Sequence, residues 1–184
     1  MRVIKTEIEG VLIIEPDVYV DNRGYFLETF RMDRFKELTG LDINFIQDNE
    51  SLSHRFVLRG LHYQTYPKPQ AKLVRVVRGA ILDVAVDLRK GSPTFKHWVM
   101  VELSGENKRQ FFIPRGFAHG FLSLEDNTIV AYKVDEYFSP EYDRGIRFND
   151  PDIGIDWRYG SNEFIISPKD RNLPYLRDAE VFDG

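Results

Sequence analysis

The chain has 184 residues, of which 42% are hydrophobic and 29% charged, and its formal net charge is −4. These values fit one domain spanning residues 1–184 and exclude an intrinsically disordered chain. The acidic balance argues against non-specific nucleic-acid binding, and the lack of cysteine excludes disulfides, thiolate metal sites and a cysteine nucleophile. No stretch reaches the roughly 20 apolar residues of a membrane helix, and residues 1–10 lack the apolar core of a signal peptide. We therefore expect a soluble cytoplasmic protein that binds neither nucleic acid nor a membrane.

Short runs rich in β-branched and aromatic residues predict a mainly β fold. In chain order the expected strands are 11–18, 57–64, 72–78, 81–89, 98–103, 110–113, 120–124 and 128–138. Gly79-Ala80, between the third and fourth of these, is typical of a two-residue hairpin turn. Residues 31–38 have the pattern of a helix that ends before Gly40, and a second short helical turn is expected near the C-terminus. Many short strands and few helices indicate a sandwich or a barrel.

Alternation along three of these strands places His62, Lys72 and Tyr132 on mainly apolar faces, which should point inward. Small barrels can enclose one ligand, so an inward lysine could serve a binding cavity. A lysine at a strand end can equally extend to water, and the pattern leaves both interpretations open. Strict alternation puts Arg59 on the face opposite His62, unless a bulge at Gly60 re-aims one of the two side chains.

Two of the four histidines, His62 and His119, lie beside glycines in aromatic strands, whereas His54 and His97 are expected at the surface. Either of the first two alone is as well explained by a half-buried structural histidine. The run Pro114–His119 resembles the second signature of the cupin superfamily. The first cupin signature carries His-x-His in metal-binding members, and the matching place here reads His62-Tyr63-Gln64. Because a catalytic metal usually needs about three protein ligands, the resemblance implies a cupin without a metal or another cofactor.

A more extensive resemblance runs along nearly the whole chain. Nine blocks occur in the order found in the dTDP-4-dehydrorhamnose 3,5-epimerase family of deoxysugar-nucleotide epimerases. These blocks are residues 21–28, 47–49, 57–64, 72–75, 83–89, 112–120, 132–133, 137–140 and 167–170. Ala71 stands where many members have glycine, and Phe138 stands where tyrosine is common, but neither departure removes a catalytic group. The resemblance implies a cupin-type jelly-roll β-sandwich or barrel with few short helices.

The resemblance also implies an isomerase that inverts C3 and C5 of dTDP-4-dehydro-6-deoxy-D-glucose, giving dTDP-4-dehydro-L-rhamnose for dTDP-rhamnose biosynthesis. Such a reaction needs a base on one face of the sugar, an acid on the other and a donor at the enolate oxygen. The resemblance assigns the base to His62, oriented by Asp170, and the acid to Tyr132. It places Lys72 at the C4 oxygen. Histidine and neutral tyrosine have ordinary pKa values that suit these two tasks.

The substrate contacts implied by the resemblance come from both ends of the chain. The diphosphate would be bound by Arg23, Arg59 and Lys169, and the thymine ring would stack on Phe138. Polar groups of the sugar or base would contact Gln47, Asn49 and Asp143. The reacting sugar would contact His119, which Asp83 orients. Arginine meets phosphate oxygens in a bidentate manner. The family also implies a homodimer in which the N-terminal segment crosses to the neighbour. In that arrangement Arg23, Phe26 and Glu28 complete the neighbour's site.

Three alternatives stay open at the level of sequence. A related 3-epimerase or 5-epimerase acting on another 4-keto-deoxysugar nucleotide would use the same base and acid. A metal-dependent cupin oxygenase would use a metal instead, although His62-Tyr63-Gln64 argues against it. A catalytically inactive sugar-binding module is disfavoured because His62, Lys72, Tyr132 and Asp170 are all present.

Overall fold

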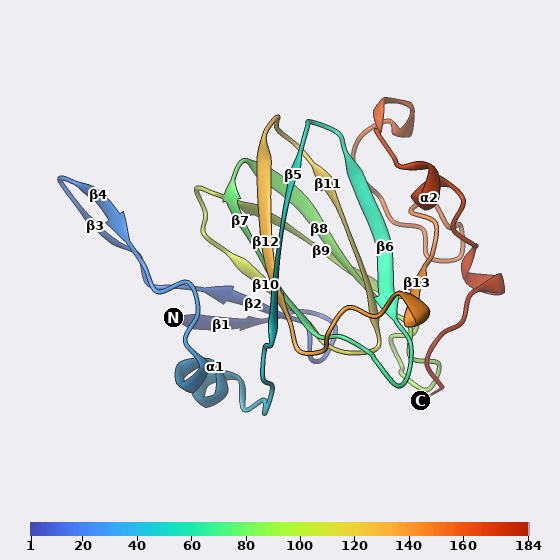
Figure 1. Ribbon diagram of the computed structural model, residues 1–184, viewed down its shortest axis with the longest axis horizontal. Helices are drawn as coiled ribbons and strands as arrows, with labels where there is room; N and C mark the ends of the chain where they lie inside the picture. The colour runs from blue at the N-terminus through green and yellow to red at the C-terminus, as the bar shows by residue number, and fades with distance from the viewer. Residues whose placement is uncertain (184) are drawn as a thin grey trace.

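Two antiparallel sheets pack face to face in the computed structural model, which describes residues 1–183 (Figure 1). The six-stranded sheet consists, in spatial order, of β1 (Arg2–Lys5), β2 (Leu12–Glu15), β10 (Gln110–Ile113), β7 (Lys72–Arg78), β12 (Thr128–Val134) and β5 (Gln47–Ser53). The five-stranded sheet consists of β13 (Asp143–Gly145), β6 (Leu58–Gln64), β11 (Phe117–Ser123), β8 (Ala80–Asp87) and β9 (Trp98–Ser104). The expected mainly β sandwich is therefore confirmed.

Three apolar clusters hold the layers together. The space between the sheets is filled from both sides, by Val74, Val76, Ile81, Phe111, Phe117 and Val130 among others. The outer face of the five-stranded sheet is covered by the C-terminal segment, which contributes Trp157 and Phe164 (Figure 1). One end of the other outer face is covered by α1 (Met32–Thr39), whose Phe35 packs on Phe112. Each large apolar side chain buried in this way contributes about 1.5–3 kcal/mol.

The expected hairpin around Gly79-Ala80 is wrong. β7 has the predicted bounds, and β8 begins one residue and ends two residues earlier than predicted. However, β7 pairs with β10 and β12, whereas β8 pairs with β9 and β11. Gly79 is a corner at which the chain passes from one sheet to the other, with φ 84°. A Cβ there would lie 2.9 Å from the Cα of Thr128. Both strands bury one apolar face in the same central cluster, each from its own sheet.

The helical predictions are confirmed. α1 ends at Gly40, whose left-handed backbone (φ 70°) lets its N–H donate to the carbonyl of Lys36. The helical turn near the C-terminus is α2 (Pro168–Arg171), where the Ser167 hydroxyl accepts a hydrogen bond from the Asp170 N–H. Three 3-10 turns span Pro140–Tyr142, Ser161–Glu163 and Leu176–Asp178. Among residues 1–183, no helix is long and apolar enough to cross a membrane.

Five strands were not predicted: β1, β3 (Tyr19–Asp21), β4 (Gly24–Phe26), β5 and β13. All of them lie at a sheet edge or in the separate two-stranded hairpin β3–β4, where little apolar surface is buried. β5 is polar at most positions, yet it pairs with β12 along its whole length. Apolar alternation is therefore weak in these strands, whereas the edge strand β9 keeps it and was predicted.

A bulge in β6 changes which of its side chains face inward. His62 lies opposite His119, and Arg59 lies opposite Phe121, so β6 uses one more residue than β11 over the same distance. The bulge expected at Gly60 is thereby confirmed, and it turns Arg59 and His62 to the same inner side. Leu58 instead packs in the outer cluster, although strict alternation would put it on the same face as His62.

Gly60 should tolerate no side chain, because its φ is 122° and a Cβ would lie 2.7 Å from the Cα of Gly120. We expect Gly60→Ala to lower the free energy of unfolding by about 1–3 kcal/mol in urea denaturation. Gly160→Ala is the matched control, because a Cβ there has no neighbour within 4 Å, and its effect should stay within about 0.5 kcal/mol. Equal urea midpoints for the two variants would contradict this account of the bulge.

Candidate active site

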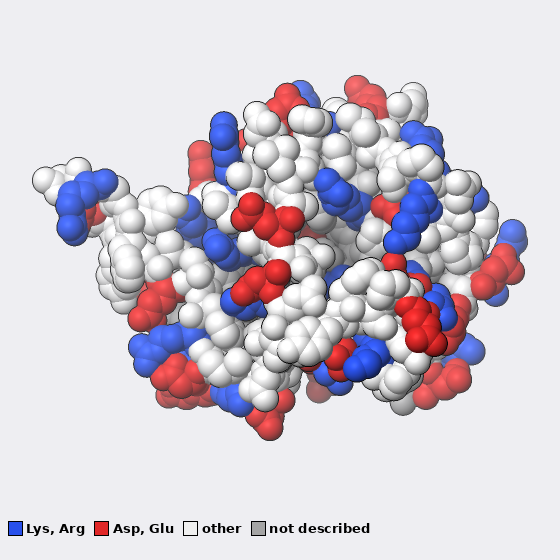
Figure 2. Space-filling view, viewed as in Figure 1, with Lys and Arg blue, Asp and Glu red and all other residues white. Residues whose placement is uncertain are grey.

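A cavity of about 310 Å³ opens between the two sheets and is closed on one side by α2. Its lining consists of Ser51, Arg59, His62, Lys72, His119, Phe121, Tyr132, Ser167, Lys169 and Asp170. Figure 2 shows a hollow on this face between β5 and β6, with Lys and Arg side chains at its rim. Seven of the ten lining residues were predicted as site residues from the sequence.

His62 and Asp170 form a hydrogen-bonded pair across 108 positions of sequence, with His62 Nε2 2.7 Å from Asp170 Oδ1. The other carboxylate oxygen accepts a hydrogen bond from the Gly60 N–H at 3.0 Å. Burial acts to raise the pKa of Asp170, but the His62 and Gly60 hydrogen bonds and the Lys169 charge outweigh it and lower that pKa below 3.8. An ionised Asp170 accepts the Nε2 proton of neutral His62, so the Nδ1 lone pair is left to act as a base.

Tyr132 lies on β12, in the sheet opposite His62, and both side chains line the same cavity. Its cross-strand neighbours are Asn49 on β5 and Val74 on β7. Burial raises the pKa of Tyr132 above 10, although an Asn49 hydrogen bond and the Arg59 charge oppose the rise. The phenol therefore holds its proton at neutral pH and can act as a donor.

Lys72 is buried at the inner face of β7, with only 8% of its surface exposed, so the alternative of a lysine extended to water is wrong. Its Nζ lies 5.7 Å from the centre of the Tyr132 ring. Burial lowers the pKa of Lys72 to about 8, against the attraction of Asp83 and Asp143. An ammonium with so little hydration is a strong hydrogen-bond donor to an oxygen that gains negative charge.

His119 forms a second pair of the same kind, with its Nε2 2.6 Å from Asp83 Oδ1. The contact that the sequence suggested between these two residues is therefore present. Both residues are buried, and His119 faces His62 across the β6–β11 ladder. Burial lowers the pKa of His119, while Asp83 opposes the change.

Two cationic side chains at the cavity are held by different partners. Arg59 donates from Nε to the Ser53 hydroxyl at 3.0 Å and from Nη2 to the Leu52 carbonyl at 3.1 Å. These bonds leave further N–H groups of the guanidinium free for a ligand. Lys169 pairs instead with Asp143 at 2.7 Å, and this hydrogen bond raises the pKa of Lys169.

A row of polar side chains along β5 borders the cavity. Gln47 donates from Nε2 to the side-chain oxygen Oδ1 of Asn49 at 2.9 Å and accepts at Oε1 from the backbone N–H of Phe138 at 3.0 Å. The Phe138 ring itself is half-exposed beside this row. The row continues with Ser51, whose buried hydroxyl has no hydrogen-bond partner among residues 1–183.

Sequence reasoning missed the lining residues Ser51, Phe121 and Ser167. Ser51 could have been found by extending the alternation of Gln47 and Asn49 by one step, had β5 been recognised as a strand. Phe121 stands two residues after His119 on the same face of β11. Ser167 carries no signal in the sequence beyond its position as a helix cap.

Of the predicted residues that do not line the cavity, three belong to the N-terminal segment: Arg23, Phe26 and Glu28. The first two belong to the β3–β4 hairpin, which projects from the body of the molecule (Figure 1). Phe26 is 67% exposed, and Arg23 pairs with Asp21 at the hairpin tip. Glu28 lies 3.6 Å from Arg31. One chain alone does not bring these three residues to the other site residues.

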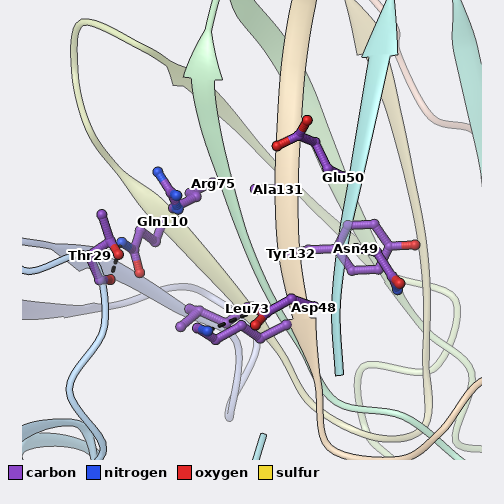
Figure 3. A pocket seen from close by; sticks show the side chains of 10 residues that line it. Thr29, Asp48, Asn49, Glu50, Leu73, Arg75, Gln110, Ala131 and Tyr132 are labelled. Atoms are coloured by element: carbon purple, nitrogen blue, oxygen red, sulfur yellow. Dashed lines mark hydrogen bonds and ion pairs between the residues drawn. The ribbon is translucent and has the colours of Figure 1, made fainter. Parts of the chain in front are cut away.

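A second cavity, of about 320 Å³, lies on the outer face of the six-stranded sheet near the base of the hairpin. Figure 3 shows Tyr132 pointing away from Arg75 and Gln110 there. Gln110 donates to the Thr29 carbonyl at 2.7 Å, and Lys133 pairs with Asp48 at 2.9 Å. These two contacts join four of the lining residues to one another. Within residues 1–183, no group of three or more His, Asp or Glu side chains is placed to hold a metal ion.

Comparison with known proteins identifies the family. The family profile described as "dTDP-4-dehydrorhamnose 3,5-epimerase" matches residues 5–178. The chain belongs to the dTDP-4-dehydrorhamnose 3,5-epimerase family. A member from Methanothermobacter thermautotrophicus is 59% identical over 182 residues, which cover 98% of this chain and 97% of that protein. The resemblance stated from sequence blocks is confirmed, and this chain is an epimerase and hence an isomerase.

The fold of this epimerase matches solved relatives. The crystal structure of the Legionella pneumophila enzyme, in complex with dTDP-4-keto-L-rhamnose, has a TM-score of 0.95 and 47% identity, and the match covers 100% of this chain and 98% of that one. A dTDP-4-dehydrorhamnose 3-epimerase from Streptomyces niveus is 38% identical over 97% of this chain and 86% of that protein. Both kinds of epimerase thus share this fold.

The Asp170 carboxylate should stabilise the epimerase fold in a pH-dependent manner. Its pKa is lowered in the folded state, so its contribution is complete above about pH 4 and is lost as the pH falls through the folded value. We expect Asp170→Asn to reduce the free energy of unfolding by about 1–3 kcal/mol at neutral pH, and by less at about pH 3. Urea denaturation at both pH values measures this, and a loss that is independent of pH would contradict it.

Proposed function

We propose that the protein inverts C3 and C5 of dTDP-4-dehydro-6-deoxy-D-glucose to give dTDP-4-dehydro-L-rhamnose, as a step of dTDP-rhamnose biosynthesis in the cytoplasm. The observation that carries the proposal is the placement of the His62–Asp170 pair and Tyr132 on facing sheets of one cavity, next to the buried Lys72. Family membership supports the same reaction. In this proposal the residues 1–184 act as one domain.

Each inversion is one proton removed and one proton added. The 4-keto group acidifies the C–H bonds at C3 and C5, and His62 Nδ1 takes the proton from one face. The electron pair moves onto the C4 oxygen, where the Lys72 ammonium donates a hydrogen bond to the enolate. The Tyr132 hydroxyl then protonates the carbon from the opposite face. Exchange with water returns His62 and Tyr132 to their starting forms before the second carbon reacts.

The diphosphate and the base are proposed to bind along the rim of the cavity. Arg59 offers its free N–H groups to phosphate oxygens, and Lys169 exchanges Asp143 for the same ligand. Phe138 stacks on the thymine ring, and Gln47 and Asn49 hydrogen-bond to the base or the sugar. His119 accepts a hydrogen bond from a sugar hydroxyl through Nδ1, since its Nε2 is occupied by Asp83.

The proposed base and acid should fail in different ways. His62→Ala should be nearly inert in both exchange and inversion, because a general base supplies about 10²–10⁴-fold of the rate. Tyr132→Phe keeps the ring and removes only the donor. It should still incorporate deuterium from the His62 face in D₂O, while inverted product falls sharply. NMR of the sugar in D₂O measures both quantities.

The same measurement tests the extent of the reaction. Label at both C3 and C5 of the product supports the 3,5-epimerase, whereas label at C3 alone would favour the 3-epimerase alternative. Asp170→Asn should lie between the two variants, because His62 remains but its tautomer and imidazolium are less well supported. Inversion at the wild-type rate by Tyr132→Phe would contradict the assignment of acid and base to opposite faces.

We also propose that the protein acts as a homodimer in which each β3–β4 hairpin reaches the partner's cavity. The hairpin exposes Tyr19, Val20, Tyr25 and Phe26, an amount of apolar surface that suits an interface. In this arrangement Arg23, Phe26 and Glu28 supply the contacts that one chain alone leaves outside the site. Arg23 then adds a second guanidinium for the diphosphate.

Mixing two inactive variants tests this exchange. Arg23→Ala and His62→Ala should each have little activity alone. After joint refolding, a mixed dimer has one site with both substitutions and one site with neither, so about a quarter of all sites should recover. A mixture as inactive as its components would mean that Arg23 and His62 of the same chain belong to one site, and it would contradict the exchange.

A further inference from the structure

One buried polar atom near the cavity has no partner. Asp83 on β8 is 0% exposed, and its Oδ1 is bound to His119 Nε2. Its other oxygen, Oδ2, makes no hydrogen bond within residues 1–183. A buried carboxylate oxygen without a hydrogen bond is costly unless a nearby positive charge offsets its own. The reaction steps described above use Lys72 and His119 but assign nothing to this oxygen.

The charged state of Asp83 follows from its surroundings. A proton on Oδ2 would bury a hydroxyl donor that has no acceptor among the described residues. An ionised carboxylate instead accepts a hydrogen bond from His119 through Oδ1. Its Oδ2 then needs no acceptor and interacts only with the charges of neighbouring groups. Burial raises the pKa of Asp83, while the charges of His119 and Lys72 oppose that rise.

We propose that Asp83 is the counter-ion that keeps the buried Lys72 ammonium charged, and that it thereby sets the alkaline limit of the reaction. Asp83 touches no substrate in this arrangement, so it is a positioning residue that acts through its two neighbours. The influence on Lys72 rests on placement: Asp83 shares the inner face of β8 with Ile81 and Ala85, and it binds His119, which lines the same cavity as Lys72. Its effect on turnover rests in addition on the proposed function, in which Lys72 donates to the enolate oxygen.

No other anion is equally placed to support Lys72. Asp143 also attracts the ammonium, but less than Asp83 does, and it is itself paired with Lys169. Asp170 is bound to His62 and Gly60. The remaining titratable or positively charged groups at the cavity are Arg59 and His62 on β6, His119 on β11, Tyr132 on β12 and Lys169 on α2. None of these offers a second stable negative charge at neutral pH.

The direction of the effect is fixed by charge. Lys72 has a pKa of about 8 while Asp83 attracts it, so part of the population loses the proton just above neutrality. Removing the negative charge of Asp83 must lower that pKa further, because only the opposing burial penalty and the weaker attraction of Asp143 remain. The protonated fraction at a given pH then falls, and the alkaline limb of activity moves toward neutrality.

Direct titration of Lys72 tests the proposal without substrate. Lysine labelled with ¹³C at Cε is followed by NMR from about pH 6 to pH 11, and the Lys72 signal is assigned by its loss in Lys72→Arg. In Asp83→Asn the Lys72 midpoint should fall by at least about one pH unit, a tenfold change in its acid dissociation constant. An unchanged midpoint in a folded Asp83→Asn protein overturns the proposal.

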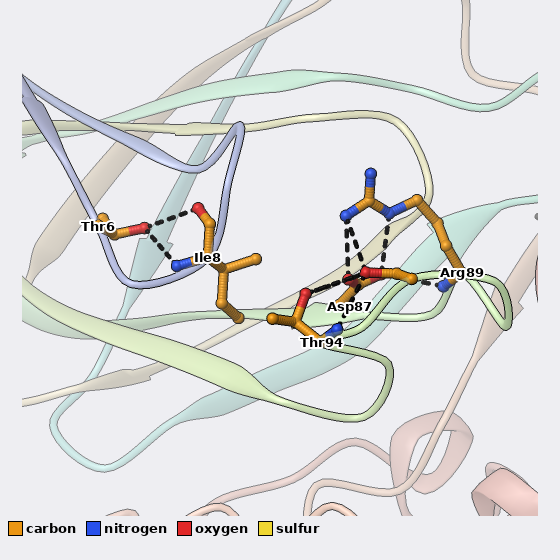
Figure 4. Close-up of polar contacts among 6 residues, drawn as sticks. Thr6, Ile8, Asp87, Arg89 and Thr94 are labelled. Atoms are coloured by element: carbon orange, nitrogen blue, oxygen red, sulfur yellow. Dashed lines mark hydrogen bonds and ion pairs between the residues drawn. The ribbon is translucent and has the colours of Figure 1, made fainter.

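Asp87→Asn is the matched control. Asp87 lies four residues further along β8 on the same face, is equally buried, and accepts hydrogen bonds from Arg89 and Thr94 (Figure 4). Its loss should lower the melting temperature without moving the Lys72 midpoint. A shift of equal size in both variants would mean that any buried carboxylate on β8 affects Lys72, and it would overturn the specific role of Asp83.

A reciprocal variant covers the case in which Asp83→Asn does not fold. Lys72→Met removes the cation, so the ¹³C titration of the Asp83 carboxyl should move to higher pH by a similar amount. An unmoved Asp83 titration would overturn the coupling.

The pH dependence of turnover provides a separate test. In Lys72→Arg the side chain stays charged, so the fall in activity that Lys72 causes at alkaline pH should disappear. Adding Asp83→Asn to this variant should not restore that alkaline limb of the pH–activity profile. Persistence of that limb would contradict the role of Lys72 in the reaction while leaving its coupling to Asp83 intact.

Discussion

The arrangement of the site depends on one constraint, which is that charged groups inside a β-sandwich must be held by partners of opposite charge. Each histidine at the cavity is bound through Nε2 to a buried carboxylate, His62 to Asp170 and His119 to Asp83. The carboxylates come from outside the β6–β11 ladder, one from α2 and one from β8. The ladder therefore supplies the imidazoles, and neighbouring elements fix their protonation and orientation.

The two histidine–carboxylate pairs differ in solvent access, and this difference separates their chemistry. The His62 side chain is 33% exposed, whereas that of His119 is 7% exposed. Exposure lets an imidazole exchange protons with water, which a recycled base requires. A buried imidazole keeps one tautomer and suits a fixed hydrogen bond. In the proposed reaction the same residue types thus serve two tasks because their depth in the sandwich differs.

Much of the inner face could be predicted from the sequence. Alternation put Lys72 and Tyr132 on apolar faces, since their strands bury one such face, but it left open whether Lys72 extends to water. The glycine at position 60 allowed for the bulge that brings Arg59 beside His62. Alternation could not reveal β5, whose inward row is polar because it faces the cavity rather than the core. Nor could it reveal the partnership of His62 with Asp170, which depends on how the C-terminal segment folds back over the sheet. The sequence around Gly79 predicts a hairpin because a two-residue connection has the same local pattern whether the strands it joins pair in one sheet or lie in two facing sheets.

The extra residue in β6 also has a consequence for how this strand can vary. Inward positions on β6 are 59, 62 and 64, so the strand changes phase once along its length. Deleting any single residue at the bulge would restore a uniform two-residue repeat. One half of the strand would then rotate by half a turn, exchanging a core side chain such as Leu58 with the guanidinium of Arg59. Length at this point of the strand is therefore as strictly constrained as residue identity, since a one-residue change would turn the cavity-facing side of β6 into its packing side.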